Sequence, residues 1–224
     1  MRFIRQGLLI AAVSAFAMSS ASASVVGWTD WLAADAGIVT GQISIDSSTI
    51  GVTANGTYSF VQTGTGGNYF NPDTPYLSSY VDNAPPAAEL IGLSAGGLVT
   101  IEFSEPVQDP LLALVSWNGN TVVFDHPIEF LSYGRGYWGD GTPVINSDGN
   151  GFFGQGEVHG VLRVPGVFTS ISFTHTSENW HGFTVGIFGA ADQPEPPSPV
   201  PEPTSLVLML SGLLGLRIAR RRRT

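Results

Sequence analysis

Apolar and polar residues alternate along much of the chain between residues 24 and 191, and a period of two is typical of β-strands. The alternation is clearest in residues 99–103, 170–174 and 183–187, where every second side chain is apolar and the residues between are polar or glycine. Further strands are expected at residues 41–45, 49–53, 58–62, 112–117, 121–125, 128–132 and 158–164. No stretch has the period of an amphipathic helix, so about ten short strands predict an all-β domain, an antiparallel two-sheet sandwich of jelly-roll-like type.

Residues 62–89 interrupt this pattern with a long stretch rich in Gly, Asn and Pro. Loops of that length usually run over the outside of a domain and often carry binding. We therefore expect a large surface excursion between two of the strands.

A mostly apolar segment stands at the N-terminus, directly after two positive charges. Arg2 and Arg5 precede residues 8–18, and residues 21–23 read Ala-Ser-Ala, the spacing of a cleavage site. The apolar part is too short to span a bilayer comfortably, whereas it fits the helix of a secretory signal peptide. We predict a signal peptide of 23 residues that the Sec export machinery reads, and a mature chain that begins at Ser24.

A second apolar segment lies near the C-terminus and follows a proline-rich linker. Residues 192–203 hold six prolines in twelve positions, which predicts a stiff, extended linker. The next segment, residues 204–224, combines an apolar run with Arg220, Arg221, Arg222 and Arg223. Residues 205–219 would span about 22 Å as a helix, against roughly 30 Å for a bilayer core. We expect a short transmembrane helix whose Arg cluster stays in the cytoplasm.

The order of these C-terminal parts resembles the PEP-CTERM sorting signal of Gram-negative bacteria. The motif itself is Pro201, Glu202 and Pro203, followed by the apolar run and the Arg-rich end. The resemblance implies that exosortase, a membrane cysteine protease-transpeptidase, cuts near this motif while the chain is anchored in the inner membrane. It also implies a final place at the cell surface or outside the cell, in association with exopolysaccharide. A similar tail is known as an ice-binding-like C-terminal motif. Three short segments, residues 103–107, 136–139 and 180–186, resemble the sequence of an exported domain that precedes such tails.

The charge of the domain limits its possible partners, and its lack of cysteine limits what can hold its fold. Residues 24–191 contain two Arg, no Lys and fifteen Asp or Glu, a formal charge of −13. Such a surface repels polyanions, so nucleic acid is not an expected partner, whereas cations and neutral glycans are compatible with it. The chain has no cysteine, so its core, alone or with metal ions, has to hold the fold in an oxidising compartment.

The sharpest local motif is a Gly-rich stretch that begins at residue 146. Oxygen-bearing side chains stand at its positions 1, 3 and 5 and a carboxylate at position 12, namely Asn146, Asp148, Asn150 and Glu157. Ca²⁺ takes several oxygen ligands from a tightly turned backbone, and this spacing matches a calcium loop. An Asn at position 1 and flanking strands favour a simple Gly-rich turn instead, so both interpretations stay open.

Aromatic residues gather near polar groups at Tyr137, Trp138, Asp140 and Trp180. Sugar-binding sites stack the apolar C–H face of a ring on an aromatic side chain and fix the hydroxyl groups with carboxylates or amides. These four residues are therefore candidate glycan-binding residues. The alternative is that the aromatic rings belong to the core or the edge of the β domain.

Two weaker patterns point to other chemistry. Glu157 and His159 fall on one face of a strand, with His175 and His181 farther along, but no pair has the spacing of a zinc motif. Surface or edge histidines are the expected interpretation. Residues 92–96 match G-x-S-x-G, yet strand residues follow in place of the helix that a nucleophile elbow needs.

Taken together, the sequence predicts four parts: a signal peptide at 1–23, an exported domain at 24–191, a linker at 192–203 and the membrane-contacting tail at 204–224. The predicted function is a non-enzymatic binding or structural role in the extracellular matrix. A calcium-dependent glycan-binding module and a secreted hydrolase are the two alternatives.

Overall fold

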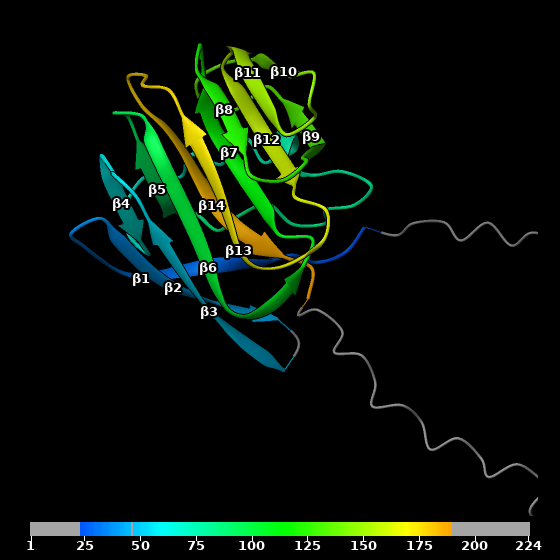
Figure 1. The fold of residues 1–224 in the computed structure, drawn as a ribbon. Helices are drawn as coiled ribbons and strands as arrows, with labels where there is room; N and C mark the ends of the chain where they lie inside the picture. The colour runs from blue at the N-terminus through cyan, green and yellow to red at the C-terminus, as the bar shows by residue number, and fades with distance from the viewer. Residues whose placement is uncertain (1–22, 46, 190–224) are drawn as a thin grey trace, which may run out of the picture. The chain divides into compact units, whose positions relative to one another are not determined.

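The computed structural model describes residues 23–45 and 47–189, which contain fourteen β-strands and one short 3-10 helix (Figure 1). Their bounds in chain order are β1 (Gly27–Asp35), β2 (Ile38–Ile45), β3 (Ser48–Asn55), β4 (Phe60–Thr63), η1 (Thr74–Tyr76), β5 (Glu89–Leu93), β6 (Gly97–Gln108), β7 (Leu111–Trp117), β8 (Thr121–Phe124), β9 (Glu129–Gly134), β10 (Gly141–Ile145), β11 (Gly151–Gly156), β12 (Val158–Arg163), β13 (Val167–His175) and β14 (His181–Ile187).

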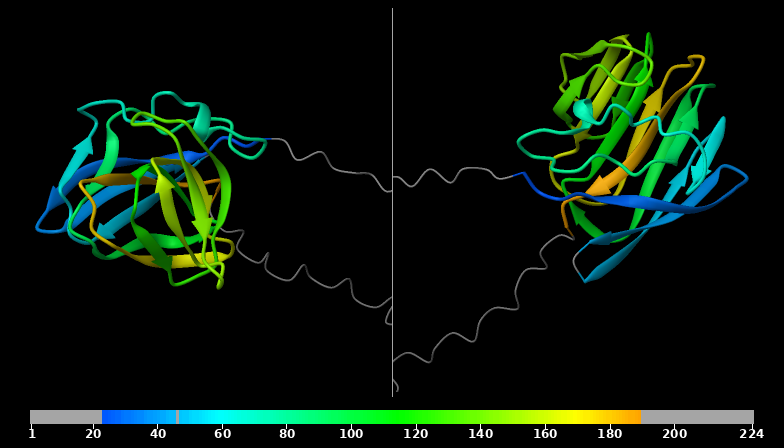
Figure 2. Two further views of the ribbon diagram at one scale, coloured as in Figure 1. Left: turned by 90° about the horizontal axis from the view of Figure 1, so that it is seen from above. Right: turned by 180° about the vertical axis from the view of Figure 1, so that it is seen from behind.

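The strands form one continuous antiparallel sheet that curls into a barrel-like shape (Figure 2). Its order is β10-β11-β8-β13-β6-β3-β2-β1-β14-β7-β12-β9, with β5 beside β14 and β4 beside β5. The turning point is β1. Its first residues Gly27 and Trp28 pair with Ile187 and Gly186 of β14, whereas the strand pairs with β2 from Thr29 onward.

The all-β, antiparallel prediction is confirmed, but the two-sheet sandwich is wrong. A sandwich has two separate sheets, whereas here the shared strand β1 joins both halves by hydrogen bonds. Each stretch that alternation predicted as a strand overlaps with a strand of the structure, although residues 58–59, 125, 128 and 164 lie outside the observed strands. Four further strands, β1, β5, β10 and β11, were not among them.

The predicted signal helix, linker and transmembrane helix all lie outside the described residues. No helix in the part of the chain that the structure describes is long and apolar enough to cross a membrane. Ser24, the predicted first residue of the mature chain, already belongs to the fold. It forms a parallel bridge with Val81, and its backbone N donates a 3.0 Å hydrogen bond to the carbonyl of Tyr80.

The main core lies inside the curled sheet. Alternate residues of each strand point inward, as in β6, where Val99 and Ile101 are fully buried while Leu98 is 57% exposed. Trp31, Trp117 and the other inward side chains complete this cluster. With no disulfide, burial of this apolar surface is the main favourable term in folding.

The stretch between β4 and β5 is a covering segment rather than a free surface excursion. Its side chains Phe70, Tyr76 and Val81 are buried in a second hydrophobic cluster with Leu111 and Val161, on the outer face of β7 and β12. Figure 2, seen from behind, shows this segment crossing that face. Strands β5, β7 and β14 are consequently buried along their whole length, which explains their continuous apolar sequences.

Candidate functional site

An open pocket of about 290 Å³ lies where the loops after β7, β9, β11 and β13 meet. Antiparallel pairing brings these loops to one end of the sheet, because the last residues of β7 pair with the first of β12 and β14. The pocket is lined by Ser116, Asn118, Trp138, Glu157, Glu178, Asn179 and Trp180. A larger pocket of about 430 Å³ beside the β1–β2 turn is lined mainly by small and apolar residues and holds a single carboxylate, so it offers less chemistry.

A β-bulge near the end of β7 aims Ser116 at the pocket. Three residue steps from Leu114 to Trp117 lie opposite two steps on β12, and Ser116 has a left-handed backbone with φ of 59°. A non-glycine residue in this conformation is uncommon and is often found at functional sites. The Ser116 hydroxyl donates a short hydrogen bond to Oε2 of Glu157.

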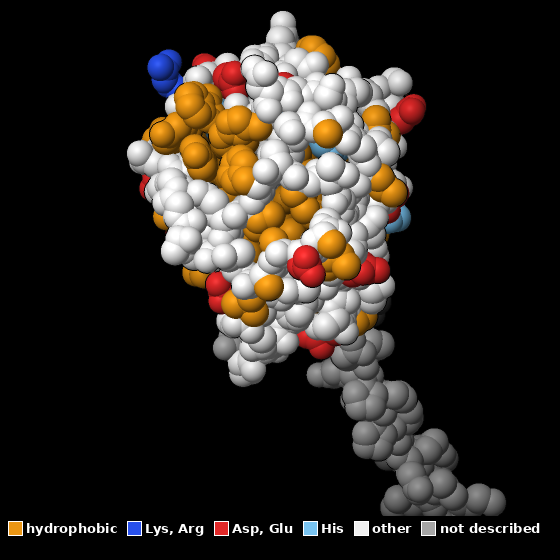
Figure 3. All heavy atoms as spheres, turned by 90° about the vertical axis from the view of Figure 1, so that its left-hand side faces the viewer, with side chains coloured by type: hydrophobic (Ala, Val, Ile, Leu, Met, Phe, Trp, Pro, Cys, Tyr) orange, Lys and Arg blue, Asp and Glu red, His pale blue; other side chains and the backbone are white. Residues whose placement is uncertain are grey.

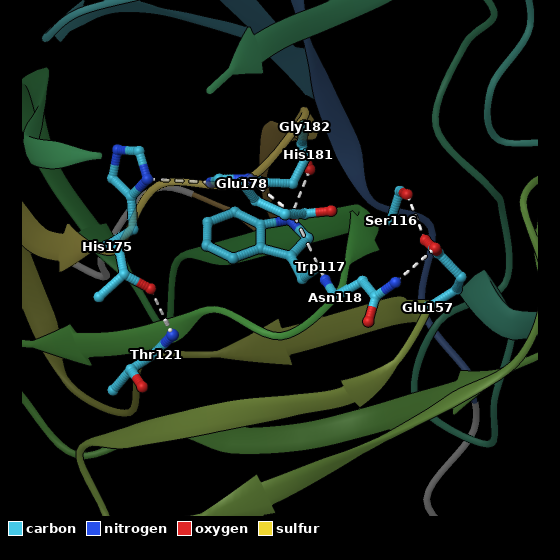
Figure 4. Close-up of polar contacts among 10 residues, drawn as sticks. Ser116, Trp117, Asn118, Thr121, Glu157, His175, Glu178, His181 and Gly182 are labelled. Carbon is cyan, nitrogen blue, oxygen red and sulfur yellow. Dashed lines mark hydrogen bonds and ion pairs between the residues drawn. The ribbon is translucent and has the colours of Figure 1, made fainter. Parts of the chain in front are cut away.

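Asn118 connects the two carboxylates of the pocket (Figure 4). Its Nδ2 donates to Oε1 of Glu157 at 2.7 Å, and its backbone N donates a longer bond to Oε2 of Glu178 at 3.4 Å. One residue of the β7–β8 loop therefore positions acids that come from two other loops. The hydrogen-bond donors to both carboxylates are neutral groups. They therefore position the two side chains without neutralising their negative charge.

Behind Glu178 lies a buried histidine pair. Nε2 of His181 lies 2.9 Å from Nδ1 of His175, and the His181 ring packs on Trp117 with 4.4 Å between ring centroids. Oε2 of Glu178 lies 3.0 Å from Nδ1 of His181, although this contact lacks hydrogen-bond geometry. Burial and then the neighbouring His181 lower the pKa of His175 to about 4, while a backbone hydrogen bond with Thr176 opposes the shift.

Five aromatic rings form a patch beside the pocket, which we call the aromatic patch. Its members are Phe60, Tyr69, Tyr137, Trp138 and Trp180. Neighbouring rings meet edge-on or tilted, with centroids 5.0 Å apart for Tyr137 and Trp138 and 6.4 Å for Trp138 and Trp180. Tyr137 and Trp138 are 47% and 52% exposed. Figure 3, which views the molecule from the side of β4 and β5, shows hydrophobic side chains gathered on that face.

The loop that presents Tyr137 and Trp138 depends on the glycines that flank them. Gly136 donates its backbone N–H to the carbonyl of Gly139 at 2.8 Å. A Cβ on Gly136 would overlap the buried ring of His159, and Gly139 has φ of 149° with Glu157 against it. The loop can therefore pass close to the sheet only with glycine at these positions.

His159 is the buried support under this loop. Its Nδ1 lies 3.2 Å from the hydroxyl of Tyr76, which comes from the covering segment. Burial lowers the pKa of His159 to about 4, against the opposing charges of Glu157 and Asp140. His159 is thus a neutral core residue and does not line the pocket.

Of the candidate glycan-binding residues, the structure brings together the three aromatic ones. Tyr137, Trp138 and Trp180 join the aromatic patch, and two of them also line the pocket. The carboxylate of Asp140 is not part of the pocket lining, and this residue contributes its backbone carbonyl, which accepts from the N–H of Glu157 at 3.1 Å.

The four candidate calcium ligands do not come together. Asn146, Asp148 and Asn150 lie in the turn between β10 and β11, whereas Glu157 follows the far end of β11, about 20 Å away at roughly 3.3 Å per strand residue. Oδ1 of Asn146 already accepts the N–H groups of Asn150 and Gly151 at 3.1 and 3.2 Å. The side chains at positions 1 and 5 of the motif therefore close a turn.

The structure supports neither a histidine metal site nor a nucleophile elbow. Within residues 23–45 and 47–189, no group of three or more His, Asp or Glu side chains is placed to hold a metal ion. The G-x-S-x-G stretch is the turn from β5 to β6, both strands, so it does not have the strand-to-helix setting of a nucleophile elbow. The carbonyl of its Ser94 accepts from the N–H of Glu178 at 3.0 Å, which helps to hold the β13–β14 loop.

Sequence reasoning missed several residues of the site. Ser116, Asn118, Glu178 and Asn179 were not singled out, because each is an ordinary loop or strand-end residue until the fold brings the loops together. The available signals were the Asn-Gly turn after Trp117 and the short polar stretch directly before Trp180.

Comparison with protein families finds one match, the PEP-CTERM protein-sorting motif, at residues 199–223. This match confirms the sorting signal expected from the tail. Comparisons with curated proteins and with solved structures gave no match.

Proposed function

We propose that this protein, which carries an exosortase sorting signal, binds a polysaccharide through the aromatic patch and the adjoining pocket, as a non-enzymatic component of the cell surface or extracellular matrix. The PEP-CTERM motif supports export and processing by exosortase. The binding role is our inference from the geometry of the exported domain.

The observation that carries the proposal is the exposed pair of rings beside a polar pocket. Trp138 is 52% exposed although contact of its apolar surface with water is unfavourable, and its ring packs against Trp180 and Tyr137. The C–H faces of sugar rings pack on such surfaces, while their hydroxyl groups need hydrogen-bonding partners close by.

The pocket supplies those partners. Glu157 and Glu178 have acceptor positions left after their bonds to Asn118, since an ionised carboxylate offers about four. Asn179 adds an amide that can donate and accept. A chain lying on the aromatic patch can therefore place one sugar in the pocket and the next over the rings.

Affinity electrophoresis tests this function. The processed protein, purified from an exporting host, is run through native gels that contain β-glucan, xylan, galactomannan or a soluble chitin derivative. We expect retardation in at least one gel and its loss in Trp138→Ala and Trp180→Ala. Phe153→Ala is the matched control, because Phe153 is 43% exposed but lies on β11 outside the aromatic patch.

The non-enzymatic part is tested in the same samples. Two carboxylates in one pocket could also serve a glycosidase, so reducing ends are measured after incubation with each polysaccharide. Release that depends on Glu157 or Glu178 would favour the secreted hydrolase. Unchanged mobility in every gel would overturn the binding proposal.

A further inference from the structure

We infer that the pocket selects glycans with a free amino group, that is, polymers of hexosamine residues whose nitrogen is not acetylated. This inference rests on the proposed function and names the class of sugar that the same site prefers.

The pocket is acidic. Glu157 and Glu178 both face it, and among its described lining residues none is Lys or Arg. Of the two Arg residues in the described chain, Arg163 pairs with Glu129 and lies 3.7 Å from Asp109, and Arg135, in the β9–β10 loop, does not line the pocket. The pocket therefore presents two carboxylates whose only hydrogen-bond donors within the described chain are neutral.

The acceptors of the pocket suit an ammonium group better than a hydroxyl or an amide. An ammonium group has three N–H donors and a full positive charge, and a hydrogen bond between charged groups is about twice as strong as one between neutral groups. A hydroxyl group offers one donor and no charge. An acetylated nitrogen likewise offers a single neutral donor and adds bulk.

Two indole rings form walls of the pocket. Trp138 and Trp180 line it with their rings at 82° to each other, and both lie beside the carboxylates. Indole faces attract cations, and they keep water away from one side of the charged groups. The pocket therefore combines two carboxylates with aromatic walls. Both features favour a sugar that carries a positively charged amino group.

Other charged ligands fit less well. Anionic glycans would meet two carboxylates in a domain whose formal charge is −13. A metal ion would find two carboxylates in this pocket, and no group of three or more acidic or histidine side chains in the described residues is placed to hold one. An amino sugar uses both the charge and the apolar walls.

Titration calorimetry with two matched ligands tests the inference. The full processed protein is titrated with a β-1,4-linked hexamer of glucosamine and with the corresponding hexamer of N-acetylglucosamine, at a pH where the free amine is protonated. We expect at least about tenfold tighter binding of the amine form, a difference of about 1.4 kcal/mol. Raising the salt to 1 M should reduce this preference, because salt screens exposed charges.

Variants then locate the preference. Glu157→Gln and Glu178→Gln should each bring the ratio of the two affinities toward one, whereas Glu105→Gln, an exposed acid outside the pocket, should leave it unchanged. The ratio is taken within one variant, so partial loss of folded protein cancels. Equal affinity of the parent protein for both hexamers, or a preference that survives both Glu variants, overturns the inference while leaving glycan binding intact. Failure of both hexamers and of every polysaccharide gel overturns the proposed function itself.

Discussion

Nε2 of His181 lies 2.9 Å from Nδ1 of His175, and both rings are buried beside Trp117. The proton of this contact is carried either by Nδ1 of His175 or by Nε2 of His181, and Nδ1 of His181 lies 3.0 Å from Oε2 of Glu178 without hydrogen-bond geometry. A carboxylate of the pocket is therefore a direct neighbour of the buried histidine pair.

Buried histidines make the stability of the domain fall in acid. The pKa values of His159 and His175 are lowered from 6.5 to about 4, so the unfolded chain binds protons at a pH where the folded domain does not. The free energy of unfolding should therefore have its full value above about pH 6.5. It should decrease as the pH falls toward 4, by at most about 3 kcal/mol for each histidine. Thermal melts between pH 7.5 and pH 4 measure this decrease.

Single variants assign the acid sensitivity. His159→Gln and His175→Gln should each lose less stability than the parent over this pH range, although both start from a lower melting temperature. His126→Asn is the matched control, because the His126 side chain is 39% exposed, unlike the buried rings of His159 and His175. A pH dependence that is the same in all four proteins would contradict the assignment.

The bulge at Ser116 stores backbone strain. Ser116→Gly and Ser116→Ala both remove the hydrogen bond to Glu157, but only alanine keeps a Cβ at φ of 59°. We expect the alanine variant to be less stable by about 1 kcal/mol, because a left-handed backbone disfavours residues with a Cβ. Urea denaturation midpoints of the two variants decide this, and equal midpoints would argue against strain.

Gly136 controls where the aromatic loop lies. In Gly136→Ala the new methyl group would overlap the His159 ring, so Tyr137 and Trp138 must move away from Trp180. Polysaccharide binding should drop at least about tenfold, or about 1.4 kcal/mol. The matched control is Gly189→Ala, where a Cβ has no neighbour within 4 Å. Wild-type retardation of Gly136→Ala in affinity gels would show that the loop position is unimportant.

Asn146 should act through the turn, with or without calcium. Its Oδ1 accepts two backbone N–H groups, so Asn146→Ala should lower the free energy of unfolding by about 1–2 kcal/mol, and Asn146→Asp, which keeps the acceptor, by less. The melting temperatures are compared in calcium and in a chelator. A calcium-dependent rise in the parent that is lost in Asp148→Ala would restore the calcium-loop interpretation.

The sorting motif predicts how the tail is processed. Glu202→Ala should prevent removal of the tail in a host that has exosortase, because this residue belongs to the matched motif. Replacing Arg220 to Arg223 with Gln should disturb sorting earlier, by weakening retention of the C-terminus in the cytoplasm. Mass spectrometry of the exported protein, with an exosortase-deficient host as the control, follows both effects. Equal tail removal in the two hosts contradicts the role of exosortase.

Strand positions were predictable where one face of a strand is buried and the other is in water, as in β6 and β13. β11 was not, because its Gly-rich sequence lacks a regular alternation. The closure of the sheet could not be predicted from the sequence either. It depends on pairing between the two ends of the domain, where Thr29 donates to the carbonyl of Val185 across 156 residues.

The candidate site was predictable only in part for the same reason. Exposed aromatic residues beside polar ones are a local signal, and they pointed to Trp138 and Trp180. The placement of Asn118 between Glu157 and Glu178 is set by three loops that are distant in sequence. A bulge such as that at Ser116 leaves no trace in the pattern of apolar residues.

The pairing of Gly27 with Ile187 also sets the moment at which this domain can fold. The strand that joins both halves of the sheet is synthesised first, and its partner is synthesised last. The sheet therefore cannot close while β14 is still inside the ribosome or the translocation channel, and closing so long a loop slows the step further. A pathway that exports unfolded chains would therefore meet a domain whose sheet closes only after its last strand has emerged.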